Sequence, residues 1–249
     1  DVLVEARVPV ISFHFGLPSA DKIAALRASG SLLLASATNL KEATAIQDAG
    51  LDGIIAQGFE AGGHRGVFDP TTPDEALSTW VLTRLICERT SLPVIAAGGI
   101  MDGAGIASVM ALGAVGAQLG TAFVPCPESS ANEGYRRALL SDAALETRMT
   151  NAFSGRPARG LRNAFLDWAQ DHSDLTPPDY PRAYDAANSL TAAAQAKGEF
   201  GFGAKPRAAR SAKLTALERS EHRVRLASQT CRSHCAGMVR RRSKYSEGS

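Results

Sequence analysis

A histidine in a glycine-rich loop is the residue of this 249-residue chain best suited to acid–base chemistry. His64 follows Gly62-Gly63, a few residues beyond the short apolar run Leu51–Ala56, which has the branched side chains of a buried strand. A neutral imidazole can remove a proton near pH 7, because its ordinary pKa is about 6.5. An ordinary connecting loop with a surface histidine is the simpler alternative, and other strand ends must be compared to choose between the two.

Two further glycine-rich turns follow buried strands. Pro93–Ala97 ends at Gly98-Gly99, and Ala114–Leu119 ends at Gly120-Thr121. Consecutive backbone N–H groups near a helix start form a cradle for an anion. In a barrel of eight β/α units, phosphate commonly binds at the loops after the last two strands. We therefore expect a phosphate site here; glycines that only make tight turns are the alternative.

Three charged or titratable residues near these loops have less specific roles. His14 lies just before the end of a strand and either faces the same site or packs in the core. Glu60 and Arg65 are expected to order the loop around His64 or to be solvated, and not to be catalytic.

Buried strands alternate with helices through the first half of the chain. The expected strands cover residues 8–15, 32–35, 51–56, 93–97 and 114–119. The expected helices cover residues 20–29, 40–49, 72–90 and 103–112. The strands show no polar alternation and the helices have about 10–15 residues, which favours parallel strands covered by helices. The chain is therefore predicted to be an α/β protein.

Capping residues mark three of the expected helix starts. Asn39 and Glu42 have the spacing of a capping box. Asp102 is placed to cap the helix that ends before Gly113. The stretch Thr72-Pro73-Asp74-Glu75 combines a cap, a first-turn proline and an acid, and so predicts another helix start.

Composition divides the chain into three parts. Residues 1–130 carry the strands and helices described above, and residues 131–203 are rich in alanine and predict a smaller helical subdomain. Residues 204–249 hold the excess positive charge and lack periodicity, so we expect a basic, disordered tail.

Several functional classes have little support in the sequence. Four cysteines are too few and too scattered for a disulfide framework. No apolar run reaches the ~20 residues of a membrane span, and the first residues show no signal-peptide pattern. A cytoplasmic protein without a membrane partner is therefore expected.

Three other motifs are weaker. Gly103-Ala104-Gly105 follows a strand, but Ser108 takes the last position of the dinucleotide fingerprint and no acid follows at the required distance. Cys231, His234 and Cys235 lack the spacing of a standard zinc site, so no metal is expected. The basic tail has no nucleic-acid-binding motif, so nucleic acid is not an expected partner.

Several separated motifs together resemble one family, the flavin-dependent nitronate monooxygenases, formerly called 2-nitropropane dioxygenases. The motifs are IIAQGFEAGGHRG, LPVIAAGGIMDGAGIASVMALGA, AQLGTAFVPCPES and, in support, PVISFHFGLPS with AFSGRPARGLRNAFL. The resemblance covers roughly residues 7–203. It implies a TIM (β/α)8 barrel that holds FMN at the carboxyl ends of its strands, with a small helical subdomain. The five strands correspond to about strands 4–8 of that barrel.

The resemblance also implies roles for individual residues. His64 matches the catalytic base, and Gln57 and Gly62 match flavin contacts. The residues implied at the phosphate end of FMN are Gly99, Gln118, Leu119, Gly120 and Thr121. The implied reaction is the oxidation of an alkyl nitronate or nitroalkane by O2 to a carbonyl compound and nitrite.

Two departures from the family leave alternatives open. The first strand of this chain corresponds to the fourth strand of the family's barrel, so we expect an N-terminally incomplete version of the family. The basic tail is the second departure, and our hypothesis for it is a frameshift in the gene. The enzyme alternative is an FMN-dependent enoyl-acyl-carrier-protein reductase, which shares EAGGH, AAGGI and GT. The other alternative is an inactive truncated fragment. The oligomeric state is left open.

Overall fold

A five-stranded parallel sheet is the main layer of the structure, a computed structural model that describes residues 2–197. Its strands are, in spatial order, β1 (Val10–Phe13), β2 (Leu32–Ala37), β3 (Gly53–Gln57), β5 (Val94–Ala97) and β6 (Gly116–Gln118). Every neighbouring pair is parallel. All five predicted strands are present with slightly different ends, and the α/β class is confirmed.

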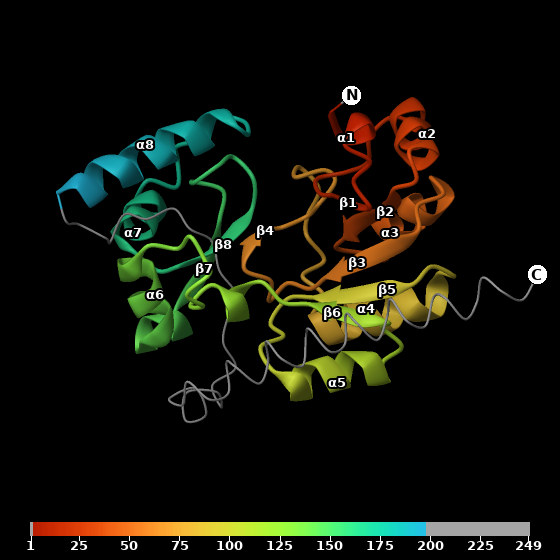
Figure 1. Ribbon diagram of the computed structural model, residues 1–249. Helices are drawn as coiled ribbons and strands as arrows, with labels where there is room; N and C mark the ends of the chain where they lie inside the picture. The colour runs from red at the N-terminus through yellow and green to blue at the C-terminus, as the bar shows by residue number, and fades with distance from the viewer. Residues whose placement is uncertain (1, 198–249) are drawn as a thin grey trace, which may run out of the picture. The chain divides into compact units, whose positions relative to one another are not determined.

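Helices precede or connect these strands (Figure 1). They are α1 (Val2–Glu5), α2 (Ala20–Ala28), α3 (Leu40–Asp48), α4 (Thr79–Arg89) and α5 (Gly103–Ala111). Parallel strands need such crossover connections, because the chain must return to the same end of the sheet before each new strand. The carboxyl ends of all five strands therefore lie along one edge.

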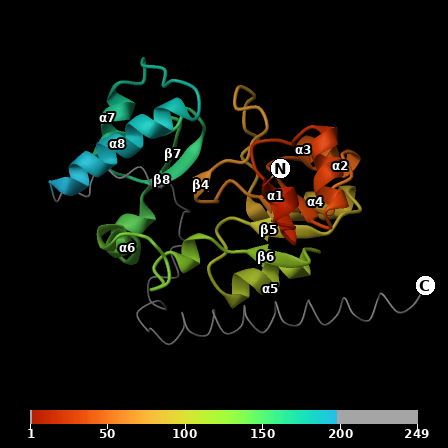
Figure 2. The same cartoon turned by 45° about the horizontal axis from the view of Figure 1, so that its top comes forward.

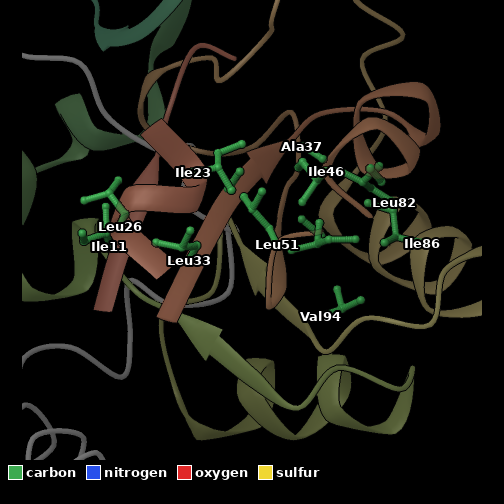
Figure 3. Close-up of a cluster of buried hydrophobic side chains, with 14 residues drawn as sticks. Ile11, Ile23, Leu26, Leu33, Ala37, Ile46, Leu51, Leu82, Ile86 and Val94 are labelled. Atoms are coloured by element: carbon green, nitrogen blue, oxygen red, sulfur yellow. The ribbon is translucent and has the colours of Figure 1, made fainter. Parts of the chain in front are cut away.

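The main hydrophobic core lies between the sheet and α2, α3 and α4 (Figure 3). The strands contribute Ile11, Leu33, Ala35, Ala37, Ile54, Ala56 and Val94. The helices contribute Ile23, Leu26, Ala43, Ile46, Leu82 and Ile86. Burial of one large aliphatic side chain stabilises a fold by about 1.5–3 kcal/mol. This packing makes the sheet a rigid support for the loops at its carboxyl edge.

Two of the predicted helix caps are confirmed. The Asn39 side chain accepts a hydrogen bond from the Glu42 N–H at 2.9 Å, and Asp102 accepts one from the Gly105 N–H at 2.8 Å. Glu42, however, does not complete a reciprocal capping box. Its carboxylate accepts a hydrogen bond from the Phe68 N–H at 2.7 Å and so ties α3 to the loop between β3 and α4.

The predicted helix start at Thr72-Pro73-Asp74-Glu75 is wrong. α4 begins at Thr79, with Ser78 as its N-cap, and the preceding residues stay in a loop. The physical reason is that the Asp74 carboxylate is the ion-pair partner of Arg65, with Nε–Oδ2 at 2.7 Å. A tertiary ion pair has therefore overridden a local capping signal.

Arg65 is fully buried, and its guanidinium closes this loop onto the end of β3. Nη1 donates to the carbonyl oxygens of Gln57 at 2.8 Å and Gly58 at 3.0 Å, and Nη2 donates to Asp74 at 2.9 Å. The prediction that Arg65 orders the loop is confirmed. Glu60 also orders the loop, because its carboxylate accepts from the Thr79 N–H at 2.8 Å.

A second, antiparallel sheet contains the histidine. β4 (Gly63–His64) pairs with β8 (Ala158–Leu161), which pairs with β7 (Thr147–Thr150). The helices α6 (Glu133–Leu140), α7 (Ala164–Asp171) and α8 (Arg182–Ala196) gather around β7 and β8 (Figure 2). Two short 3-10 helices are η1 (Thr121–Phe123) and η2 (Asp142–Leu145). Phe153, Leu166 and Ala187 form a separate small core there.

The C-terminal half is thus not built of helices alone, which corrects one part of the prediction. β8 begins inside the motif SGRPARG and β7 precedes it, whereas the sequence indicated this motif only as an interruption between helices. The boundaries 1–130 and 131–203 stay a prediction. The predicted basic tail, residues 204–249, lies outside the described residues, as do Cys231, His234 and Cys235.

The described residues contain no membrane-spanning helix, no metal-binding cluster and no disulfide. No helix among residues 2–197 is long and apolar enough to cross a membrane. The same residues contain no group of three or more His, Cys, Asp and Glu side chains placed to hold a metal ion. Cys87 and Cys126 are both free thiols. The cytoplasmic location stays a prediction.

We expect the Arg65→Met substitution to lower the free energy of unfolding by about 3 kcal/mol, because the buried carbonyls and the Asp74 carboxylate lose their donor. Urea unfolding near neutral pH measures this loss. Arg84→Met is the matched control, since Arg84 pairs with Glu88 on the exposed surface of α4 and should cost under about 0.5 kcal/mol. Equal losses in the two variants would contradict the structural role of Arg65.

Candidate functional site

His64 lies in β4 and is held against the second sheet. It stands opposite Ala158 of β8, and its Nε2 atom lies 2.7 Å from the hydroxyl oxygen of Ser154. Ser154 is fully buried in the segment before β8. Because a buried hydroxyl cannot exchange its partner for water, this contact fixes the imidazole ring. The sequence assigned no role to Ser154.

The hydrogen bonds of Ser154 indicate which ring nitrogen of His64 is free. Ser154 Oγ lies 3.2 Å from the Arg156 carbonyl oxygen and accepts from the Arg156 N–H at 3.3 Å. In the tautomer in which the Ser154 hydroxyl donates to that carbonyl, His64 Nε2 carries the ring proton and donates to Ser154, and Nδ1 is the unprotonated nitrogen. Within residues 2–197, Nδ1 has no hydrogen-bond partner, so its lone pair is free to accept a proton.

Aromatic rings surround His64. The rings of Phe15, Tyr180 and Tyr184 meet the imidazole edge-on, with centroids at 5.6, 5.9 and 5.9 Å. Sequence reasoning missed all three, because they come from segments far from His64 in the chain. The one available signal was the position of Phe15 in SFHFG and of Tyr180 in LTPPDYP, segments that interrupt regular elements, whereas Tyr184 lies inside α8 and carried no such signal.

His14 faces the same site, which settles the alternative that the sequence left open. Its Nδ1 atom lies 3.0 Å from the Ser36 hydroxyl, and it makes a hydrogen bond to the backbone of His64. Its ring lies 4.4 Å from the ring of Phe15, centroid to centroid. The two imidazoles therefore lie close together beside β4, with His64 half-buried and His14 exposed.

Both histidines are biased toward the neutral form. Burial lowers the pKa of His64 below 6.5, and the charges of His14 and Arg156 lower this pKa further. Burial also lowers the pKa of His14; the hydrogen bond to the His64 backbone opposes this shift, while Arg156 and Arg65 add to it. His64 is therefore an unprotonated imidazole near pH 7, as a general base requires.

Gln57, at the end of β3, binds the loop that carries His64. Its side-chain Nε2 donates to the His64 carbonyl oxygen at 3.0 Å, and its Oε1 accepts from the Gly66 N–H at 2.7 Å. The side chain is 8% exposed. Gly62 lies half-buried just before β4. Their predicted contacts with a flavin stay predictions, and the structure adds a loop-positioning role for Gln57.

The residues predicted for phosphate lie together at the ends of β5 and β6. Ala97 is in register with Gln57 on one side and with Gln118 on the other, so three strand ends are adjacent. Gln118 is exposed, Leu119 packs against a small core under α5, and Thr121 begins η1. Gly99 has a φ of +66°, in the left-handed region that favours glycine.

Two backbone donors at this edge are unused. Among residues 2–197, neither the Gly99 N–H nor the Gly120 N–H donates a hydrogen bond. A Cβ atom at Gly120 would meet no protein atom within 4 Å, so the space beside this residue is open. Beside Gly99, by contrast, a Cβ atom would lie 3.1 Å from Glu60 Cβ. Free N–H groups at neighbouring strand ends suit the oxygens of a phosphate group.

Parallel β/α units with their polar groups at the carboxyl edge define the class of protein as a ligand-binding domain of TIM-barrel type. Residues 1–210 match the family model described as nitronate monooxygenase. The chain therefore belongs to the nitronate monooxygenase family, a family of flavin-dependent oxidoreductases.

Curated relatives share much of the sequence. The nitronate monooxygenase of Paraburkholderia phytofirmans is 60% identical over 203 residues, which are 82% of this chain and 56% of the relative. The nitronate monooxygenase of Pseudomonas aeruginosa is 50% identical over 203 residues, 82% of this chain and 58% of the relative. The chain thus spans just over half the length of the curated relatives it matches.

Solved structures agree with this assignment. Nitroalkane oxidase from Streptomyces ansochromogenes superposes with a TM-score of 0.79 at 38% identity, over 94% of this chain and 68% of that one. FabK from Thermotoga maritima superposes with a TM-score of 0.68 at 28% identity, over 94% of this chain and 73% of that one. The expected barrel-type fold is confirmed.

The lowered pKa values of both histidines make stability depend on pH. Near pH 6.5 the histidines of the unfolded chain bind protons, whereas those of the folded chain stay neutral. The free energy of unfolding is therefore at its full value above about pH 6.5 and falls as the pH drops below it. We expect the double substitution His14→Asn and His64→Asn to flatten the unfolding free energy between about pH 7.5 and about pH 5.5, measured with urea. An unchanged pH dependence would contradict the lowered pKa values of the two imidazoles.

Proposed function

We propose that this chain, loaded with FMN, oxidises alkyl nitronates and nitroalkanes with O2 to a carbonyl compound and nitrite, with His64 as the base that removes the α-proton of the neutral nitroalkane. The observation that carries the proposal is the neutral, half-buried imidazole of His64, whose Nδ1 atom has no hydrogen-bond partner in residues 2–197. Membership of the nitronate monooxygenase family supports the same reaction class.

His64 has the chemistry that the neutral form of the substrate requires. The proton on the carbon next to a nitro group is acidic enough for a neutral imidazole to remove. Ser154 holds Nε2, so Nδ1 takes the proton and the ring stays in one orientation. A nitronate has already lost this proton, so its oxidation does not need the base. The aromatic rings of Phe15, Tyr180 and Tyr184 pack around His64 and restrict the directions from which a substrate can approach it.

The residues at the carboxyl edge suit FMN. The free N–H groups of Gly99 and Gly120 would hold the phosphate end, together with Gln118, Leu119 and Thr121. Gln57 and Gly62 lie where the family's flavin contacts are expected, next to the loop that carries His64. When bound, FMN supplies the electron transfer to O2.

The proposed function is tested by nitrite release. The FMN-loaded chain should release nitrite from ethyl nitronate and from nitroethane in the presence of O2. Oxidation of NADPH with enoyl thioesters, without nitrite release, would instead assign the enoyl-acyl-carrier-protein reductase activity. A chain that stays colourless after FMN is added and desalted would assign the inactive fragment.

We expect His64→Asn to lower kcat/KM for nitroethane about a hundredfold or more, the contribution typical of a general base. Turnover of ethyl nitronate and the bound flavin spectrum should be retained, because neither depends on proton removal. His172→Asn, at an exposed position after α7, is the control and should leave both substrates unaffected. Unchanged nitroethane turnover in His64→Asn would exclude His64 as the base.

Gly120→Val tests the phosphate site. A Cβ atom at Gly120 meets no protein atom within 4 Å, so we expect a valine there to leave the fold intact while it fills the space that the phosphate would occupy. We expect the Kd for FMN to rise about tenfold or more, measured by flavin fluorescence titration. Gly103→Val, at a position with equally open surroundings, is the control and should leave the Kd unchanged. Equal Kd values for FMN in the two variants would contradict a phosphate site beside Gly120.

A further inference from the structure

We propose that Arg156 binds the negative charge of the substrate, and so makes the chain prefer a nitronate anion to the neutral nitroalkane with the same carbon skeleton. This inference rests on the proposed function and adds a specificity-determining residue to it. It is carried by the position of Arg156, by its lack of an ion-pair partner in residues 2–197 and by its effect on both histidines.

The turn Ser154-Gly155-Arg156 fixes the position of this residue. Ser154 Oγ accepts the Arg156 N–H and also contacts His64 Nε2 at 2.7 Å, so the Arg156 backbone and the His64 ring share one hydroxyl. Gly155 has a φ of +77°, and a Cβ there would lie 2.3 Å from the Pro178 carbonyl oxygen. Only glycine fits between this turn and the segment that brings Tyr180 to His64.

The Arg156 side chain reaches toward the site and is held there. Its guanidinium carbon lies 4.5 Å from the centroid of the Phe15 ring, which touches both His14 and His64. Nη1 donates to the Val67 carbonyl oxygen at 3.0 Å. A cation over an aromatic face with one hydrogen bond is oriented, but its charge is not cancelled.

Arg156 forms no ion pair in the described part of the chain. Among residues 2–197, no Asp or Glu lies within ion-pair distance of Arg156, whereas Arg65 is paired with Asp74. Asp69 is influenced at longer range: hydrogen bonds are the main cause of its lowered pKa, and the charge of Arg156 adds to this shift without a direct contact. The Val67 carbonyl oxygen is the only hydrogen-bond acceptor of the Arg156 guanidinium among these residues. A guanidinium has five N–H donors, so several of them are available to a ligand.

The charge acts on the reacting region. Arg156 lowers the pKa of both His14 and His64, so its field extends over the two imidazoles. The same field stabilises an anion placed beside His64. In a nitronate, two oxygen atoms on one nitrogen share the negative charge, and their geometry matches the paired donors of a guanidinium as a carboxylate does.

Two substrates with one carbon skeleton separate this role from a structural one. Ethyl nitronate carries its charge before it binds, so Arg156→Met should raise its KM about tenfold or more, the effect of one lost charge-assisted hydrogen bond. Nitroethane is neutral and acquires charge only as its proton leaves. Arg156→Met should therefore lower kcat/KM for nitroethane less than for ethyl nitronate, and the decrease should be in kcat. Arg156→Lys keeps the positive charge, so its KM for ethyl nitronate should lie between those of Arg156→Met and the unsubstituted chain.

Nitrate gives a second readout, because it is an unreactive anion with the same O–N–O unit. Its competitive inhibition constant against ethyl nitronate should rise in Arg156→Met. Arg148→Met is the matched control, since Arg148 in β7 pairs with Asp167 on the surface, and it should change neither constant. All variants are assayed as the full FMN-loaded chain.

The outcomes distinguish this inference from the proposed function. If the unsubstituted chain releases no nitrite from either substrate, the proposed function fails. If the unsubstituted chain is active and Arg156→Met lowers turnover of both substrates equally, with unchanged KM and nitrate inhibition, the role of Arg156 is overturned while the proposed function stands.

Discussion

A fully buried guanidinium is the interaction on which the arrangement around His64 depends. Burial of a cation costs several kcal/mol unless partners compensate it. Arg65 therefore draws in the carbonyl oxygens of Gln57 and Gly58 and the carboxylate of Asp74. These bonds close the long loop between β3 and α4 onto the strand end. Because His64 directly precedes Arg65 in the chain, closing this loop also sets where the imidazole can lie.

The second sheet completes what the loop begins. β4 is two residues long and would be unstable alone, but β8 supplies its hydrogen-bonding partner, and Ser154, just before β8, holds the His64 ring. The parallel sheet therefore supplies the strand ends and the C-terminal half supplies the groups around the imidazole. Neither part alone would bury His64, and burial is the main cause of its lowered pKa.

Local signals in the sequence predicted the elements better than they predicted the site. The five strands were readable because buried parallel strands are continuous apolar runs, and Asn39 and Asp102 cap helices through contacts only three residues away. The helix start predicted at Thr72-Pro73-Asp74-Glu75 was wrong because the Asp74 carboxylate pairs with the buried guanidinium of Arg65 and does not cap a helix. Ser154 and Tyr180 carry no local pattern that links them to His64. Their roles arise from packing between segments distant in the chain, which a single sequence does not encode locally.

The electrostatics around His64 favour a base over an acid. A carboxylate beside an imidazole would raise its pKa and keep it protonated. Here the three influences on His64 are burial, His14 and Arg156, and each of them lowers the pKa. The imidazole therefore stays neutral while a cation stays close by. An environment of this kind assists the removal of a proton from a neutral carbon acid and stabilises the anion that remains, whereas it would oppose the delivery of a proton to an anionic substrate.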